Sequence, residues 1–423
     1  MSLFKKKEKA MPPLNSSDSA NTESRVIDAE VHLDIPDDEI WTYRVEGLAA
    51  PHINKPYKNF TLKKIIFTLV ILVAVSLSCY FSVRTVQSDT FEYATADGGY
   101  ELSKFSNTGY VTELTIDYVS DIEYDRTNED VTSNFEIVKD ETKKVVSVGK
   151  YAFNCDGTVK VINIGAEVLN IDPKAFYSCW SLQRIEVDEN NPNYCDIDGV
   201  LYNKDMTQVI NYPCNHDQYL REKYGYEAEP YRADSDEKYV KDIQTYVVPS
   251  TVKTIGQLAF AYTNLRTIYL PEGLETIETL GVFKLHEPKD QYSNTPSLDN
   301  IYTYKAEKAV TETVFTSEEE LGEIYLSLPE TLTYIGSDAF SYNQTLTYLF
   351  IPKAVTFIGH HAFWDTVYKE GGELIGVTQI FAEADEDTFK KEVKTGDQWR
   401  PQYDYMLFKK SVDVVYGAER QAK

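Results

Sequence analysis

The sequence predicts a solenoid of stacked coils, with a parallel β-sheet on its concave face and a turn-rich convex side, preceded by one transmembrane α-helix. Two observations support this fold class. Residues 65–83 form a run of 19 residues without a charge, about the length that crosses a bilayer as a helix. A fixed period of 20 to 50 residues is typical of solenoid repeats. Phenylalanine recurs 23 residues apart in three separate pairs: Phe153/Phe176, Phe260/Phe283 and Phe340/Phe363.

Each coil follows the approximate pattern L-x-x-I-x-L-P-x-x-V-x-x-I-G-x-x-A-F. Its first part is a predicted strand, and proline ends four of these strands because it has no N–H to donate to a ladder. One coil cannot bury its apolar face alone, so stacked coils share a core. We expect the recurring glycine to serve a turn and the Ala-Phe pair to place a ring in the core. The predicted strands are 159–164, 182–187, 243–248, 265–270, 323–328, 346–351 and 377–382.

Three segments carry a resemblance to a known family: "LPETLTYIGSDAF", "IPKAVTFIGHHAF" and "AFYSCWSLQRIEV". They resemble the BspA-like class of leucine-rich repeat surface proteins, and the resemblance covers about 91–418. The segment 191–213 looks like an interruption common in that class, and "SVDVVYG" at 411–417 resembles its C-terminal cap. The resemblance implies a leucine-rich repeat solenoid and a surface-exposed recognition role, but no particular activity.

The chain divides into five predicted segments, and the repeat domain among them carries insertions. The segments are a mostly disordered cytoplasmic tail (1–62), a transmembrane helix (63–84), an N-terminal cap with a first insertion (85–140), the leucine-rich repeat domain (141–418) and a C-terminal tail (419–423). Insertions are expected near 189–240, 284–318 and 366–375. In the N-terminal cap we expect five apolar side chains to point inward: Leu102, Phe105, Val111, Leu114 and Ile116.

Charges beside the apolar run predict its orientation. Four lysines precede it between residues 55 and 64, and acidic side chains dominate after Arg84. The positive-inside rule therefore places the N-terminus in the cytoplasm and the repeat domain outside the cell membrane, which 65–83 crosses as a single-pass signal-anchor. A cleaved signal peptide and a buried core helix are the alternatives. A signal peptide has a short leading region, whereas 64 residues precede this run.

Residues 37–57 differ from the rest of the tail because they hold Trp41, Tyr43 and a Gly-Leu-Ala-Ala run. We interpret them as a motif that binds a cytoplasmic partner, with Trp41 and Tyr43 as its contact residues. The alternative is a juxtamembrane stretch that lies on the bilayer surface.

Composition and motifs argue against several functional classes. The net charge of −25 argues against a nucleic-acid partner, which requires a basic face. The six histidines show no metal-ligand spacing, and neither a P-loop nor a G-x-S-x-G motif occurs. "DIDG" at 196–199 resembles part of a calcium loop, but the twelfth position is Thr207, so we expect a β-turn. We therefore predict no enzyme, no metal site and no cofactor.

Four cysteines lie in the predicted exterior, where disulfides form. Cys155 and Cys179 occupy nearly equivalent positions in adjacent coils, and a separation of about 5 Å fits a disulfide. Buried thiols are the alternative for these two. Cys195 and Cys214 lie in the same insertion and are a second candidate pair.

Alternation along each strand predicts which side chains point outward from the concave sheet. Aromatic rings on an open sheet are typical of a surface that binds an extracellular protein or a glycan. The alternative is that the insertions at 284–318 and 366–375 fold over the rings as a satellite core. The outward aromatic residues of the C-terminal coils are Tyr269, Tyr325, Tyr348, Phe350 and Phe381.

Together, these features predict a non-catalytic protein for cell-surface recognition or adhesion, whose ligand binds the concave face. The alternative is a structural component of a cell-envelope assembly whose cytoplasmic tail recruits a partner. Because repeat surfaces vary freely on one scaffold, the pattern does not name the ligand.

Overall fold

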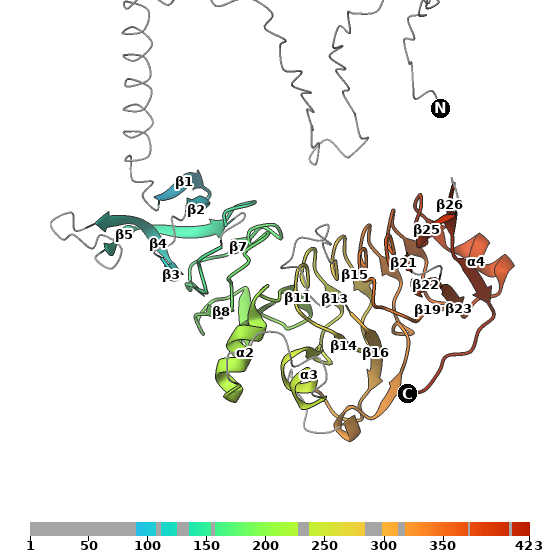
Figure 1. Cartoon of the computed structure of the whole chain (residues 1–423). Helices are drawn as coiled ribbons and strands as arrows, with labels where there is room; N and C mark the ends of the chain where they lie inside the picture. The colour runs from blue at the N-terminus through green and yellow to red at the C-terminus, as the bar shows by residue number, and fades with distance from the viewer. Residues whose placement is uncertain are drawn as a thin grey trace, which may run out of the picture. The chain divides into compact units, whose positions relative to one another are not determined.

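The computed structural model describes residues 90–106, 111–124, 135–153, 157–226, 237–283, 298–311, 318–370, 373–405 and 408–423 (Figure 1). All of them belong to the second of two compact units, Val86–Lys423. The predicted membrane span at 65–83 and the tail motif with Trp41 and Tyr43 lie outside the described residues. Within these ranges, no helix is long and apolar enough to cross a membrane.

The longer strands of the coils follow the predicted repeat, but they form three sheets instead of one. The first and third sheets are parallel throughout, and the middle sheet is parallel except for its last strand. The first contains β3 (Glu113–Ile116), β6 (Val161–Ile164) and β8 (Arg184–Val187). The second contains β12 (Thr245–Val247), β14 (Thr267–Pro271), β16 (Asn300–Lys305) and β17 (Glu323–Tyr325). The third contains β19 (Leu349–Ile351), β23 (Gln379–Ala382) and β27 (Asp413–Tyr416).

A second ladder of two-residue strands lies on the other side of the core. Its members are β13 (Thr254–Ile255), β15 (Thr276–Ile277), β18 (Tyr334–Ile335), β20 (Phe357–Ile358) and β24 (Lys394–Thr395). They are parallel, and three strands of one insertion extend them to an eight-stranded sheet: β9 (Tyr194–Ile197), β10 (Val200–Asn203) and β11 (Gln208–Asn211). The isoleucines that end the first four of these strands are fully buried in the main core. The apolar positions of the repeat therefore meet between the two ladders.

The recurring glycine is required by close packing between coils. A Cβ on Gly336 would lie 2.4 Å from the backbone N of Thr279, and one on Gly359 would lie 2.3 Å from that of Ser337. Neither glycine has a positive φ; the residue two positions later in each coil does, Asp338 and His361 here. The glycine is thus needed because neighbouring backbones approach closely, and the left-handed turn falls on another residue.

The Ala-Phe pairs pack as the repeat predicts. The rings of Phe340 and Phe363 stack with centroids 5.5 Å apart and planes at 9°, and those of Phe153 and Phe176 lie 5.8 Å apart at 18°. All four rings and the alanines before them are buried. Adjacent coils therefore stack ring on ring inside the core.

The N-terminal part has a five-stranded sheet of its own. It contains β1 (Thr90–Ala96), β2 (Gly99–Ser106), β4 (Tyr118–Tyr124), β5 (Phe135–Val148) and β7 (Asn170–Ile171). The predicted first insertion is the antiparallel β4–β5 hairpin. The five side chains expected to point inward are all buried, which confirms that prediction: Leu102, Phe105, Val111, Leu114 and Ile116.

Two other predicted insertions contain regular elements. The one near 189–240 holds β9 (Tyr194–Ile197), β10 (Val200–Asn203), β11 (Gln208–Asn211), α2 (His216–Tyr224) and α3 (Glu237–Ile243). The one near 366–375 is the hairpin of β21 (Val367–Glu370) and β22 (Glu373–Gly376). The C-terminal coils add α4 (Glu386–Glu392) and the hairpin of β25 (Gln402–Tyr405) and β26 (Phe408–Ser411).

Among the described residues, 298–311 and 318–328 depart in part from the predicted insertion at 284–318 and the predicted repeat strand at 323–328. The repeat strand is β16, which pairs in parallel with β14, while β17 pairs antiparallel with the far edge of β16. Leu298 and Ile301 enter the main core at the L-x-x-I spacing of the other coils. Of the predicted strand 323–328, Leu328 does belong to the main core, whereas Glu323 at the leading apolar position is exposed and lies on the antiparallel strand β17.

Candidate ligand-binding face

Side chains on β14 alternate as predicted. Ile268 and Leu270 belong to the main core, whereas Tyr269 belongs to a separate cluster with Val247 and Tyr304. Tyr269 is nevertheless only 3% exposed. The alternation therefore identified the correct face of the sheet but not the accessibility of the ring.

The segment that follows β16 covers Tyr269. Leu321, at the end of the 3-10 helix η2 (Glu318–Leu321), is fully buried in the same cluster. The Tyr269 hydroxyl donates to Oε1 of Glu318 at 2.8 Å, and the Tyr302 ring stacks on Tyr269 at 5.2 Å. Burial, followed by the hydrogen bond to the Glu318 carboxylate, raises the pKa of Tyr269. At Tyr269 the structure therefore has the alternative arrangement, in which an insertion folds over the ring as a satellite core.

Residues 417–423 also cross this face, although 419–423 were expected to form a separate tail. We call this segment the C-terminal strap; it follows β27 and ends beside β17. Figure 1 marks the C-terminus below β16. Leu326 N donates to Gln421 O at 3.0 Å, and Lys423 N donates to Ile324 O at 2.9 Å. The strap is therefore paired by its backbone with the segment that contains β17.

Tyr325, another predicted contact residue, lies beneath Arg420 of the strap. The guanidinium carbon is 4.0 Å from the centroid of the Tyr325 ring. Arg420 donates from Nε to Ser327 Oγ at 2.7 Å and forms ion pairs with Glu272 at 2.7 Å and Glu330 at 3.1 Å. Its side chain is only 10% exposed. Tyr325 is thus half-buried under a charged side chain of the same molecule.

The remaining three predicted contact residues lie on or beside β19 and β23. Phe350 is only 1% exposed, so its ring offers no binding surface here. Tyr348 and Phe381 are half-buried, and their rings stack with centroids 5.0 Å apart at 21°. The Tyr348 hydroxyl is buried and has no hydrogen-bond partner among the described residues. Of the five predicted aromatic contact residues, Tyr348 and Phe381 are the two that keep an accessible surface and do not lie under the strap.

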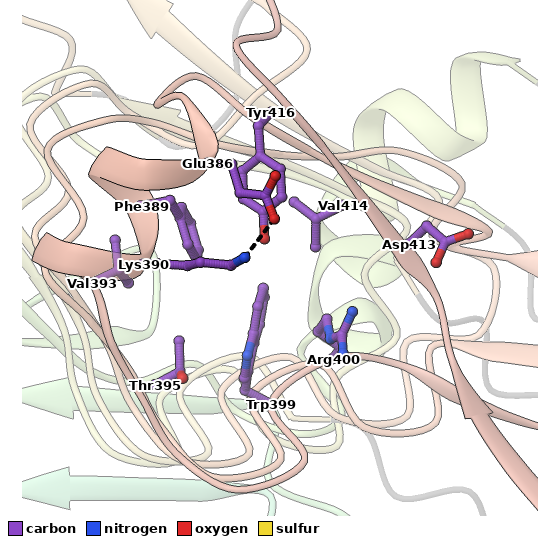
Figure 2. A pocket seen from close by; sticks show the side chains of 10 residues that line it. All are labelled: Glu386, Phe389, Lys390, Val393, Thr395, Trp399, Arg400, Asp413, Val414 and Tyr416. Carbon is purple, nitrogen blue, oxygen red and sulfur yellow. Dashed lines mark hydrogen bonds and ion pairs between the residues drawn. The ribbon is translucent and has the colours of Figure 1, made fainter.

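A pocket of about 580 Å³ lies at the end of the last coils. Aromatic side chains of α4, β27 and the segment between β24 and β25 line it: Phe389 stacks on Trp399 at 5.9 Å, and Tyr416 meets Phe389 edge-on at 5.5 Å. Figure 2 shows Trp399 between Phe389 and Arg400, pointing towards the ion pair of Lys390 and Glu386. The charged lining residues are Glu386, Lys390, Arg400 and Asp413. Rings with charges at the rim suit a ligand that has both apolar faces and polar groups.

Neither the strap nor this pocket was predicted from the sequence, although one signal for the pocket exists. In "TGDQWR" the last coil keeps the repeat glycine, but Trp399 stands at the alanine position. The backbone confirms this alignment, because Phe363 N donates to Trp399 O as Phe340 N donates to Ala362 O. Close-packed coils leave no room for a large ring at the alanine position, so the tryptophan marks the end of the regular stack.

The structure does not form the predicted Cys195–Cys214 disulfide. Both residues are thiols. Cys195 Sγ, on β9, donates to Asn203 O of β10 at 3.3 Å, whereas Cys214 Sγ lies 3.7 Å from Ala261 O. Hairpin pairing between β9 and β10 thus directs the two sulfur atoms to different neighbours.

Cys179 is a buried thiol as well, and its sulfur donates to Phe153 O of the preceding coil at 3.1 Å. For Cys179 this arrangement matches the alternative prediction, a buried thiol, and not the Cys155–Cys179 disulfide. Cys155 itself lies outside the described residues.

The predicted β-turn in "DIDG" is confirmed. Asp198 and Gly199 have φ values of 52° and 81° and connect β9 to β10, as a two-residue hairpin turn with two left-handed residues requires. The Asp198 carboxylate accepts from the Tyr219 hydroxyl at 2.9 Å and from Lys223 at 2.7 Å. In the described part of the chain, no three His, Cys, Asp or Glu side chains converge in a way that could hold a metal ion.

Comparison with known families matches more than half of the chain. Residues 103–218 and 238–369 match the model of the BspA type leucine-rich repeat region in six copies. The matched ranges contain most of both ladders and end before the terminal pocket. A comparison with curated proteins finds no significant match.

Solved structures with some similarity include bacterial leucine-rich repeat proteins. One from Eubacterium ventriosum is 18% identical with a TM-score of 0.37, over 67% of this chain and 64% of that one. The pneumococcal vaccine antigen PcpA is 17% identical with a TM-score of 0.32, over 64% and 65%. The match thus spans less than two thirds of either protein. A leucine rich cell surface protein of Faecalibacterium prausnitzii is 14% identical with a TM-score of 0.24, over 76% and 95%.

Proposed function

We propose a recognition function on the premise that the chain belongs to the BspA type leucine-rich repeat family. In this proposal it is a non-catalytic cell-surface protein that binds an extracellular protein or a glycan. Residues 65–83 anchor it in the membrane with the repeat domain outside, and 37–57 bind a cytoplasmic partner. The uncharged run and the lysines before it support the anchoring.

The observation that carries the recognition proposal is the stacked pair of Tyr348 and Phe381. Phe381 lies on β23 and Tyr348 directly precedes β19, the neighbouring strand of the third sheet, and neither ring belongs to the main core. Ile380 and Ala382, which alternate with Phe381, are fully buried in that core. Large rigid rings on a sheet contribute contact area with proteins and stack on the faces of sugars.

The test is ligand capture by immobilised residues 86–423 from a glycan array and from cell-surface extracts. The variant Tyr348→Ser/Phe381→Ser should lose at least about 10-fold in affinity, because removing two contact rings costs more than 1.4 kcal/mol of binding. Phe350 is left intact because its buried ring supports the fold.

A matched control exists on the opposite ladder. Tyr334 and Phe357 also stack, at 4.8 Å and 6°, and Tyr334 is 38% exposed. The variant Tyr334→Ser/Phe357→Ser should keep full binding. If Tyr334→Ser/Phe357→Ser lost ligand binding while Tyr348→Ser/Phe381→Ser kept it, the site would lie on the ladder of two-residue strands and the proposed location would be refuted.

A further inference from the structure

The C-terminal strap lies against β17 as an extended peptide lies in a binding groove. Tyr325 of β17 and Ala422 of the strap form an antiparallel bridge, with backbone hydrogen bonds on both sides of it. The opposite edge of β17 is occupied by β16. Addition of a strand to an open sheet edge is a recurring mode of peptide recognition.

Two basic side chains of the strap fit the acidic and aromatic groups of this face. Arg420 lies over the Tyr325 ring between Glu272 and Glu330, as described above. Its low exposure indicates a shaped site, since surface ion pairs normally leave an arginine in water.

Lys423 occupies a second position three residues later. Its Nζ lies 4.4 Å from the centroid of the Tyr302 ring and 3.0 Å from the Tyr269 hydroxyl, and it pairs with Glu318. Burial acts to raise the pKa of Glu318, but the hydrogen bonds from Lys423 and Tyr269 outweigh it and hold that pKa below its usual range. The face thus presents two cation sites, each with a ring and a carboxylate.

The strap contributes little apolar surface of its own. Its apolar side chains are the methyl groups of Ala418 and Ala422, and residues 421–423 are exposed. The contacts are therefore backbone pairing, cation–π contacts and ion pairs, each of which a second peptide of the same chemistry can reproduce. No large side chain has to leave a core when the strap departs.

We propose that this face is a binding site for an extended basic peptide with arginine and lysine three residues apart, and that the strap occupies the site in cis. The inference rests on the proposed recognition function and deepens it by naming a ligand class. Its residues are separate from Tyr348 and Phe381, so the two proposals fail independently. A tethered segment acts at an effective concentration of about 1 mM, so the strap competes with any peptide in trans.

The test uses a fluorescent peptide of sequence GAERQAK, which copies 417–423, and measures its anisotropy with two proteins. One is the chain 1–423 and the other is the same chain ending at Tyr416. The peptide should bind the shortened chain at least about 10-fold more tightly than the full chain. The peptide GAEAQAK, without the arginine, should bind at least about 10-fold more weakly. Added salt should weaken binding, because ion pairs contribute to it.

Glu272→Gln in the shortened chain should weaken binding of GAERQAK, whereas Glu275→Gln, at a carboxylate that pairs with Lys253 instead, should not. Should the shortened chain not fold, the full chain with Arg420→Ala and Lys423→Ala replaces it and should bind the peptide more tightly than the unmodified chain. Equal binding to the strapped and released forms, or no binding to a folded released form, would overturn the proposal. Tyr348→Ser/Phe381→Ser should leave peptide binding unchanged, so failure of ligand capture by that pair does not affect this result.

Discussion

Tyr304 and Tyr348 both lie outside the main core, but their hydroxyl groups differ in whether they have a hydrogen-bond partner. The Tyr304 hydroxyl donates to Val248 O at 2.7 Å, whereas the Tyr348 hydroxyl has no partner in the described part of the chain. Burial raises the pKa of both phenols. The same chemical group therefore contributes to stability at one site and costs stability at the other.

We expect Tyr304→Phe to destabilise the fold by about 1–2 kcal/mol, because it removes a buried hydrogen bond and leaves a carbonyl unsatisfied. Tyr348→Phe should be neutral or stabilise by up to about 1 kcal/mol, because it removes an unsatisfied hydroxyl. Urea unfolding of residues 86–423 measures both changes. A marked loss of stability in Tyr348→Phe would mean that the hydroxyl has a partner.

The direction of a side chain could be predicted from the sequence, but its exposure could not. The period of two correctly predicted that Tyr269 and Phe381 point away from the main core. It could not predict that Tyr269 is covered, because the cover comes from Leu321 and Lys423, residues distant in sequence. Exposure depends on tertiary contacts that no local pattern encodes.

At the scale of the element, the coil-to-coil contact decides which substitutions the repeat accepts. A Cβ on Gly359 would meet Ser337 N at 2.3 Å and the carbonyl carbon of Gly336 at 2.5 Å. Both atoms belong to the backbone of the preceding coil, so they cannot move away as a side chain would. We therefore expect Gly359→Ala to destabilise the chain by about 3 kcal/mol, as overpacking in a close-packed interior does.

Gly273→Ala is the matched control, because no heavy atom of the described residues lies within 4 Å of a Cβ there and its φ is not positive. It should change the free energy of unfolding by less than about 1 kcal/mol. Equal effects of the two substitutions in thermal or urea unfolding would show that the coils do not approach as closely as the structure has them.

The strand predictions were correct where the repeat is regular and missed strands where it is interrupted. The strands that became β14 and β19 overlap their predicted ranges, because leucine, isoleucine and proline stand at the template positions. β16 was missed because the residues around it look polar, and only Leu298 and Ile301 carry the pattern. The strap was missed because pairing with β17 uses backbone atoms and two charges, which leave no periodic signal.

For the whole molecule, the pH dependence of stability provides a test of the insertion that contains α2. His216 is 2% exposed, and its Nδ1–H donates to Gln183 O at 2.7 Å. Burial lowers the pKa of His216 to about 4, although the hydrogen bond to Gln183 O and the charge of Asp198 both act to raise it. The histidine is therefore neutral in the folded chain at pH 7.

Because the folded pKa lies below the unfolded value of about 6.5, the unfolded chain binds the proton first as pH falls. The contribution of His216 is complete above pH 6.5 and is lost as pH falls to about 4. We expect this group to account for at most about 3 kcal/mol of the loss. Urea unfolding at several pH values should show a shallower decline for His216→Asn than for the unmodified chain. An unchanged slope would place the protonated group elsewhere.

The whole fold was predictable to the level of its architecture. Stacked coils around a shared core follow from one 23-residue pattern, because stacking is the way for such coils to bury their apolar side chains. The ladder of two-residue strands was not predicted, because that side of the solenoid was expected to be irregular and rich in turns. The division into three sheets and the terminal pocket were not predictable. They arise where insertions and the last coil depart from the pattern, and there contacts between distant residues replace local rules.

The repeated glycine contact also bears on how such a chain changes in length over generations. Gly336 N donates to Ile277 O, Gly359 N to Ile335 O and Gly396 N to Ile358 O, all at 2.7–2.8 Å. Each junction joins the same donor to the same acceptor, so unequal recombination within the gene that removes or duplicates one unit between two such glycines restores an identical joint. The scaffold can thus gain or lose reach in steps of one coil, while the surface that it displays evolves separately.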